Sequence, residues 1–183
     1  MFEWLTSVLK PLINAWIIVG LVALWLLLAV AFQYVGDRLK KFSGGCGSLD
    51  GRFGYTPELA RKMLGAYGTE GRRFYARYEL TLDMVFPAVT ALLTNLLLLA
   101  CGPSLLDNAG FLGVLALLPF AAMLADYLEN ATVLLMLKRF PGDIASIARL
   151  GSIVGRAKWV LYLVPGSVAV VSLLAWVWQR WAP

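Results

Sequence analysis

The sequence predicts an all-α membrane protein: a four-transmembrane-helix bundle with a cytoplasmic amphipathic helical segment between the first and second spans. The first observation is composition, since 60% of the 183 residues are hydrophobic and only 15% are charged, with a mean hydropathy of +0.74. The second is that the apolar residues form four long runs with few charges. The third is that positive charges gather after the first and third runs. A soluble domain would carry much more polar surface.

Each of the four runs is long enough to cross a hydrocarbon core of about 30 Å as a helix. The predicted spans cover about residues 11–34, 80–101, 110–137 and 159–178. All four are rich in Leu, Ala and Val and lack alternation of apolar and polar residues, which favours helices over the strands of a barrel. We therefore expect residues 1–183 to form a single integral membrane domain.

Lysine and arginine residues predict the orientation of the spans. Nine of them lie between spans one and two and five follow span three, whereas only Lys10 and Arg180 lie on the other side. The positive-inside rule then places both long connections in the cytoplasm and both termini outside. We expect a multi-pass integral membrane protein, as in the bacterial inner membrane. The net charge of +5 follows from this asymmetry and suits anionic headgroups. A membrane lipid is therefore the expected partner, with no nucleic acid, and a homo-oligomer stays open.

The cytoplasmic segment, residues 36–78, begins with a glycine-rich stretch that predicts a flexible loop at 43–48. Thr56, followed by proline, predicts the cap and first turn of a short helix over 57–66. The apolar residues of this helix fall on one face: Leu59, Met63 and Leu64. We expect the helix to lie on the membrane surface.

The connection after the third span contains a second predicted break. Pro141 and Gly142 interrupt the helical pattern, and Asp143 can cap a short basic helix that leads to Arg156. We expect this helix to precede the fourth span.

Several kinds of chemistry are excluded because the chain has no histidine and only two cysteines. Without imidazole there is no histidine-ligated haem, no histidine-dependent zinc site and no Ser-His or Cys-His nucleophile pair. Cys46 and Cys101 are predicted on opposite sides of the membrane, out of reach of a disulfide. Chemistry must rest on carboxylates, Lys, Arg, Tyr, Ser, Thr or a thiol.

Three acidic residues lie inside predicted spans, where a charge costs about 2.5–3.5 kcal/mol and has to be sheltered from lipid. Asp126, Glu129 and Asn130 occupy positions i, i+3 and i+4, so they share one face of the third span. Asp83 lies about 26 Å below the outer end of the second span, and Asp126 about 24 Å below that of the third. We expect both carboxylates at one level, one or two turns inside the cytoplasmic boundary.

A second polar stripe follows the helix of span two into the cytoplasm. Its members recur at steps of three, four and seven: Arg72, Tyr75, Glu79, Asp83, Thr90 and Thr94. Facing the two stripes toward each other shelters every polar side chain inside the bundle. Arg77, Lys138 and Lys158 are expected to reach the lower rim of this site.

The predicted function is to bind, and chemically modify, an amphipathic lipid or isoprenoid-like molecule at a carboxylate-rich site near the inner leaflet. Asp83, Asp126 and Glu129 are the candidate catalytic residues, because a protonated acid beside an ionised one is the minimum for acid–base catalysis without histidine. The candidate substrate-binding residues are Asn130, Glu79, Tyr75, Arg72, Arg77, Lys138 and Lys158.

Three alternatives stay open. The same acids could carry protons or cations in a transporter or channel subunit. They could instead pair with basic residues and hold the helices in register in a non-catalytic assembly partner. Oxygen ligands could also bind Mg²⁺ or Ca²⁺. The Asp-x-x-Glu-Asn spacing with a lone Asp on another helix lacks a repeated acidic motif, so no metal ligand and no cofactor is assigned.

In residue types, the membrane-embedded carboxylates and Asn130 resemble the emopamil-binding sterol isomerase group of small helical membrane proteins. The active-site histidine of that group has no counterpart in this sequence. No residue role is therefore taken from the resemblance.

Overall fold

The computed structural model describes residues 2–106 and 108–181, and every regular element in this part of the chain is a helix. The elements in order are α1 (Phe2–Leu9), η1 (Lys10–Leu12), α2 (Ala15–Ser43), α3 (Pro57–Ala66), α4 (Gly68–Glu79), α5 (Leu82–Cys101), η2 (Gly102–Ser104), α6 (Ala109–Arg139) and α7 (Ala145–Trp181). The predicted all-α class is confirmed.

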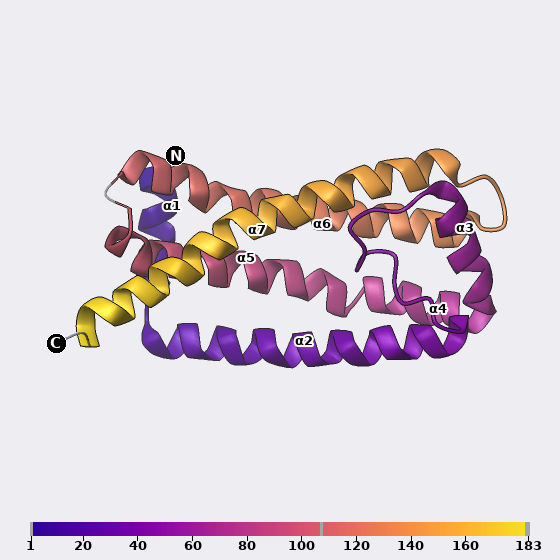
Figure 1. Cartoon of the computed structure of the whole chain (residues 1–183), viewed down its shortest axis with the longest axis horizontal. Helices are drawn as coiled ribbons and strands as arrows, with labels where there is room; N and C mark the ends of the chain where they lie inside the picture. Colours follow the sequence, from indigo (N-terminus) through magenta and orange to yellow (C-terminus); the bar gives the residue numbers. More distant parts are fainter. Residues whose placement is uncertain (1, 107, 182–183) are drawn as a thin grey trace.

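Within the described residues, four helical segments are long and apolar enough to cross a membrane: α2, the segment Gly68–Ser104 that contains α4 and α5, α6, and α7. They run along the long axis of the molecule, and both ends of the chain lie at the same end of the bundle (Figure 1). The predicted four-span architecture is therefore confirmed.

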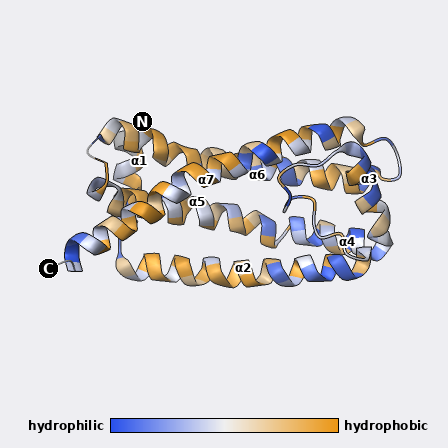
Figure 2. Cartoon of the chain, viewed as in Figure 1, coloured by the Kyte–Doolittle hydropathy of each residue, from blue (hydrophilic) through white to orange (hydrophobic). Residues whose placement is uncertain are grey.

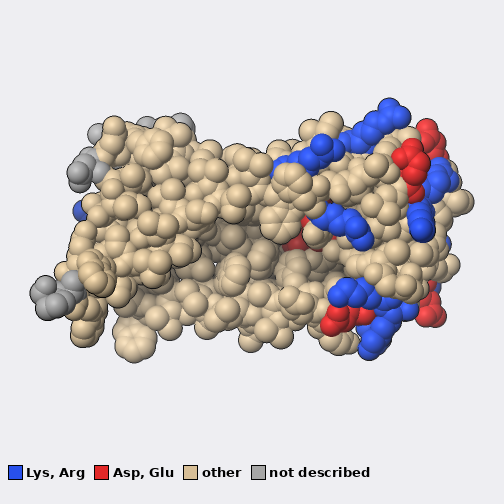
Figure 3. Space-filling model, in the orientation of Figure 1, with Lys and Arg blue, Asp and Glu red and all other residues tan. Residues whose placement is uncertain are grey.

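Charged and apolar residues occupy different parts of the bundle. The hydrophilic residues concentrate toward the end that carries α3 and α4 (Figure 2). On the face drawn in Figure 3, Lys, Arg, Asp and Glu gather at that same end, and the rest of the face is largely uncharged. We call the part of the bundle around α3 and α4 the charged end.

The helix α7 differs from the prediction because it is continuous. Asp143 Oδ1 accepts a hydrogen bond from the backbone N–H of Ala145 at 2.9 Å, as a cap should. The helix then continues without a break to Trp181, so the predicted short basic helix and the fourth span are one element. Two glycines allow this first part of α7 to lie against α6. A Cβ on Gly151 would overlap Thr132 Oγ1 and the Tyr55 hydroxyl, and a Cβ on Gly155 would overlap Glu129 Oε1.

The helix α3 has the predicted bounds and the predicted cap, with Leu59 N donating to Thr56 Oγ1 at 3.2 Å. Its position differs from the expectation. Met63 and Leu64 are fully buried in a cluster with side chains of α2, α6 and α7. The apolar face of α3 therefore packs against the charged end of the bundle. Packing against protein removes this face from water just as binding to the membrane surface would.

At the opposite end, α1 is a helix that sequence reasoning did not predict. Leu5 and Leu9 are buried in a cluster with Leu96 of α5 and Ala116 of α6. Short helices gain most of their stability from such packing, so an eight-residue helix carries little signal in its own sequence.

The second span contains a break that positions two acids. The sequence predicted one continuous helix, whereas α4 ends at Glu79 and α5 begins at Leu82. The Thr81 hydroxyl donates to the carbonyl of Arg77 at 2.7 Å and so satisfies one of the acceptors at the end of α4. Glu79 thus lies in the last turn of one helix and Asp83 in the first turn of the next.

Candidate functional site

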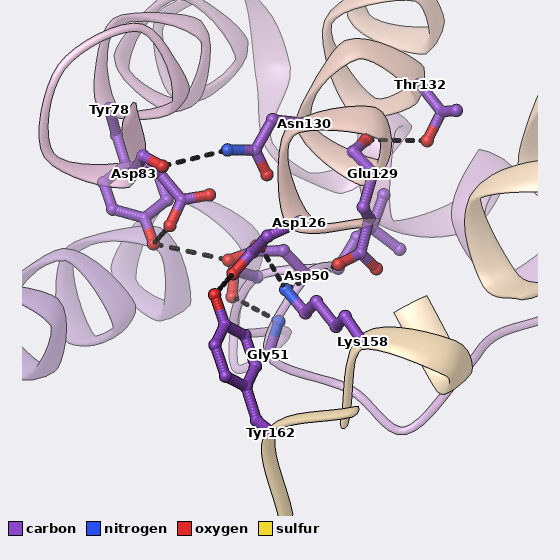
Figure 4. Close-up of polar contacts among 12 residues, drawn as sticks. Asp50, Gly51, Tyr78, Asp83, Asp126, Glu129, Asn130, Thr132, Lys158 and Tyr162 are labelled. Atoms are coloured by element: carbon purple, nitrogen blue, oxygen red, sulfur yellow. Dashed lines mark hydrogen bonds and ion pairs between the residues drawn. The ribbon is translucent and has the colours of Figure 1, made fainter. Parts of the chain in front are cut away.

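Five buried acids from four parts of the chain form the candidate site, which we call the carboxylate cluster. Asp50 comes from the loop before α3, Glu79 from α4, Asp83 from α5, and Asp126 and Glu129 from α6. Each is at most 5% exposed, although acids are rarely buried without a partner. Figure 4 shows Asp50, Asp83, Asp126 and Glu129 converging between the helices.

The α7 helix supplies the positive charge of the cluster. Lys158 Nζ lies 2.9 Å from Asp126 Oδ1 and 2.6 Å from Glu129 Oε2. The Tyr162 hydroxyl, one turn further along α7, donates to Asp126 Oδ2 at 3.2 Å. One buried lysine therefore holds two carboxylates of α6, and Asp126 is fixed from both of its oxygens.

Tyrosines of α4 bring the Asp50 loop into the cluster. The Tyr75 hydroxyl donates to Asp50 Oδ1 at 2.6 Å and accepts from the backbone N–H of Leu49 at 2.9 Å. The Tyr78 hydroxyl lies 3.3 Å from Asp50 Oδ2 and 3.4 Å from Asp83 Oδ1. Because a hydroxyl carries one proton, Tyr78 can donate to only one of these two carboxylates at a time.

Glu79 and Asp83 are poorly supplied with donors. Glu79 is 0% exposed, and among the described residues neither of its carboxylate oxygens has a hydrogen-bond partner. Asp83 Oδ2 is also buried without one. One carboxylate oxygen from each of three residues lies within 4.8 Å of the other two: Asp50, Glu79 and Asp83. These three residues are called the acidic triad below.

The acid-bearing faces of α5 and α6 meet, as expected. The side chain of Asn130 donates from Nδ2 to the backbone carbonyl of Asp83 at 3.1 Å. Figure 4 shows Asp83 in the same cluster as Asp126, Glu129 and Lys158. The structure thus brings Asp83, Asp126, Glu129 and Asn130 together, along with Glu79, Tyr75 and Lys158.

Three basic residues expected at this site lie elsewhere. The Arg72 guanidinium donates to the carbonyl of Leu64 at 3.0 Å and lies over the ring of Phe140. Arg77 and Lys138 are exposed. None of the three forms an ion pair within the described part of the chain. Arg77 and Lys138 lie in the last turns of α4 and α6, where long basic side chains can reach water and need no buried partner.

Asp50, Tyr78 and Tyr162 are the site residues that sequence reasoning did not assign. Asp50 follows a glycine-rich stretch, where an acid is ordinarily solvated, and its two tyrosine partners lie 25 and 28 residues further along the chain. A local signal existed only for Tyr78, which stands three residues after Tyr75 and so on the same helix face.

Two tyrosines outside the spans also adjoin the cluster. Burial, followed by the charge of Glu129, raises the pKa of the Tyr55 hydroxyl well above its usual value. Burial, followed by the charge of Asp50, raises the pKa of Tyr67 in the same direction. Both hydroxyls therefore stay neutral at physiological pH, and Tyr67 donates to the carbonyl of Gly47 at 2.6 Å.

An apolar groove of about 740 Å³ lies between α2 and α7 with α5 as its floor. It is lined by Val22, Trp25, Leu26, Thr90, Leu93, Thr94, Leu97, Trp159, Tyr162, Leu163, Gly166, Ser167, Ala169, Val170 and Val171. Figure 3 shows a hollow along this face, with acidic atoms visible in the depth toward the charged end. Tyr162 joins the two features, because it lines the groove and donates to Asp126.

Comparisons with protein-family models, with curated proteins and with solved structures give no match to this chain. Its class therefore rests on the structure alone. The chain is a four-span membrane protein with a buried carboxylate cluster.

Proposed function

We propose that the protein binds an amphipathic lipid or isoprenoid-like molecule and modifies its polar head by acid–base chemistry. The apolar chain of this molecule would lie in the groove and its head at the carboxylate cluster. The observation that carries the proposal is the position of Tyr162, whose ring lines the groove and whose hydroxyl donates to Asp126 at 3.2 Å.

The groove has the properties of a site for a long apolar chain. Its volume lies within the range of about 300–1,000 Å³ that is usual for ligand pockets. Along α7 it extends from Trp159 to Val171, about 18 Å at helical rise. That length is a little over half of a hydrocarbon core of about 30 Å. A lipid could enter sideways from the bilayer without bringing its chain into water.

The end of the groove next to the cluster supplies the chemistry. Asp126 and the Tyr162 hydroxyl are the groups that a bound head would meet first, and acid–base catalysis requires a group within hydrogen-bond reach of the reacting atom. Lys158 holds Asp126 from behind and is itself paired with Glu129. The three acids proposed to be catalytic then differ in position. Asp126 would contact the head of the lipid, and Asp83 and Glu129 would lie behind Asp126.

The groove favours a lipid site over the transporter alternative. Apart from Trp and Tyr, its polar lining residues are Thr90, Thr94 and Ser167. The indole N–H of Trp25 already donates to Thr90 Oγ1 at 3.1 Å. An ion would meet too few polar groups along this wall to replace its hydration shell.

The proposal also includes an orientation, with the charged end in the cytoplasm of a bacterial cell and both termini outside. Cys46 lies near the charged end and is partly exposed, whereas Cys101 is buried. A membrane-impermeant maleimide should label Cys46 in inside-out vesicles and leave it unlabelled in intact cells. The reverse pattern would overturn the orientation.

The binding proposal is tested by mass spectrometry of lipids that co-purify with the protein. Gly166 lines the groove, and a Cβ there meets nothing within 4 Å, so the side chain of Gly166→Trp can start without a clash and its indole should fill the groove. Gly20 on α2 is equally open and does not line the groove, so Gly20→Trp is the matched control. Wild type and Gly20→Trp should retain the same lipid, and Gly166→Trp should lose most of it. Equal lipid in all three proteins would refute the proposal.

The chemical step is tested separately with Asp126→Asn. This variant should retain the lipid in the groove but accumulate it in an unmodified form, so that the retained species differs in mass or, for an isomerisation, in chromatographic retention from that of wild type. If both proteins carry the same species and wild type does not convert it on incubation, the acid–base role fails while binding stands.

A further inference from the structure

The geometry points to a binding site for a hard divalent cation, of the Mg²⁺, Mn²⁺ or Ca²⁺ type, at the acidic triad of Asp50, Glu79 and Asp83. The triad is separate from the ion pairs that Lys158 forms with α6. The cation site does not depend on the groove or on its occupant.

Charge balance is the first reason. Among the described residues, no Lys or Arg nitrogen forms a salt bridge, within 4.0 Å, with any carboxylate of the triad. The one buried lysine of the cluster, Lys158, already lies against Asp126 and Glu129. Ionised carboxylates are costly to bury unless a cation accompanies them. A dication would neutralise most of the charge of the triad.

The second reason is Glu79, which points into the triad without a partner. Its side chain is fully buried, and neither oxygen has a hydrogen-bond partner in the described part of the chain, although one of them lies within 4.8 Å of oxygens of Asp50 and Asp83. Asp83 Oδ2 is likewise buried without a hydrogen-bond partner among the described residues. About nine in ten buried polar groups in proteins are paired. Coordination would give these oxygens the partner that no side chain supplies.

The spacing of the oxygens fits a single ion. Two oxygens on opposite sides of a Ca²⁺ ion lie about 4.6–5.2 Å apart, twice the usual Ca–O distance, and on opposite sides of Mg²⁺ about 4.0–4.2 Å apart. The triad oxygens lie within 4.8 Å of one another, so one ion can contact all three with little movement. The triad offers carboxylate oxygens and no nitrogen or sulfur, a donor set that suits Mg²⁺, Ca²⁺ and Mn²⁺.

Tyrosine hydroxyls of α4 hold one of the ligands in place. Tyr75 donates to Asp50 Oδ1 at 2.6 Å, which fixes the loop carboxylate and leaves Oδ2 toward Tyr78. Hydrogen bonds to ligating carboxylates orient them and tune their affinity for the metal. Asp50 is therefore positioned before an ion arrives, although it belongs to a loop.

The experiment measures Mn²⁺ binding by the full-length protein in detergent after treatment with EDTA. The electron paramagnetic resonance signal of free Mn²⁺ reports binding, and Mg²⁺ and Ca²⁺ are added as competitors. Wild type should bind one Mn²⁺ saturably. Glu79→Gln and Asp83→Asn should each weaken binding by about tenfold or more, the scale seen when a metal site loses a supporting group.

Matched controls separate the cation site from folding and from the lipid proposal. Asp37→Asn removes an exposed acid paired with Lys40 and should bind Mn²⁺ as wild type does. Gly166→Trp should lose lipid but keep Mn²⁺ binding, so failure of one proposal leaves the other testable. Glu79→Gln removes an unpaired buried charge, so its thermal unfolding in EDTA should be no earlier than that of wild type. The site is overturned if wild type binds none of the three ions saturably, or if the triad variants bind Mn²⁺ as tightly as Asp37→Asn.

Discussion

Replacing Lys158 by methionine tests whether one lysine neutralises the α6 acids. In wild type, Lys158 Nζ lies 2.9 Å from Asp126 Oδ1 and 2.6 Å from Glu129 Oε2, and the lysine is 6% exposed. Methionine keeps much of the length and apolar volume of the side chain but removes its charge. Two buried carboxylates then lose their cation. Removing one partner of a buried ion pair is costly because it leaves a buried charge uncompensated.

The expected loss follows from the usual cost of breaking a buried ion pair. Removal of one partner of a buried ion pair costs about 3–5 kcal/mol. For a chain of 183 residues, each kcal/mol corresponds to about 2–4 °C in Tm, so Lys158→Met should lower Tm by about 6–20 °C. A triple variant that combines Lys158→Met with Asp126→Asn and Glu129→Gln has no uncompensated buried charge at this ion pair and should recover most of that loss.

The assay is thermal unfolding in detergent, followed by the fluorescence of the seven tryptophans. Lys40→Met is the matched control, because Lys40 and its partner Asp37 are 55% and 64% exposed and such a surface pair contributes about 0–1 kcal/mol. A Tm for Lys158→Met within the range of the Lys40→Met control would refute the ion-pair reasoning. So would a triple variant that is no more stable than Lys158→Met.

Three further predictions use the same unfolding assay. Gly155→Ala should destabilise the protein by about 1–3 kcal/mol, because its Cβ would overlap Glu129 Oε1, whereas Gly166→Ala on the same helix meets nothing within 4 Å and should be neutral or stabilising. Tyr75→Phe should cost about 1–3 kcal/mol, since Asp50 loses its 2.6 Å hydrogen bond; an equal loss in the exposed Tyr34→Phe would contradict this. Thr56→Ala should cost about 1 kcal/mol through the lost helix cap, and no change would show that Thr56 Oγ1 does not cap α3.

The sequence predicted most of the fold because membrane spans are encoded locally. A run of about twenty apolar residues is a signal contained in one segment, and the same is true of a Thr-Pro helix start such as that at residue 56. The i, i+3, i+4 pattern of Asp126, Glu129 and Asn130 likewise predicts a shared face without knowledge of any other helix. The meeting of this face with Asp83 followed from the cost of exposing acids to lipid.

What the sequence did not reveal depends on contacts between distant segments. Asp50 enters the cluster because hydroxyls of α4 hold its loop, and no property of residues 43–55 signals those partners. The break at Leu80 and Thr81 was hidden because both residues are compatible with a helix. Lys158 was expected at the rim, yet glycines of α7 let that helix approach α6 closely enough for the lysine to enter the cluster.

The anchoring of the Asp50 loop has a consequence for how reactants reach the interior. Hydrogen bonds from Leu49 N to Tyr75 and from Tyr55 N to Ser152 Oγ, at 2.9 Å each, tie this loop to α4 and α7. The loop is thus fixed to α4 and α7, whereas the groove lies between α2 and α7. Under the two proposals above, a cation would reach the acidic triad past the loop and a lipid would reach Tyr162 through the groove, so the two ligands would use separate routes.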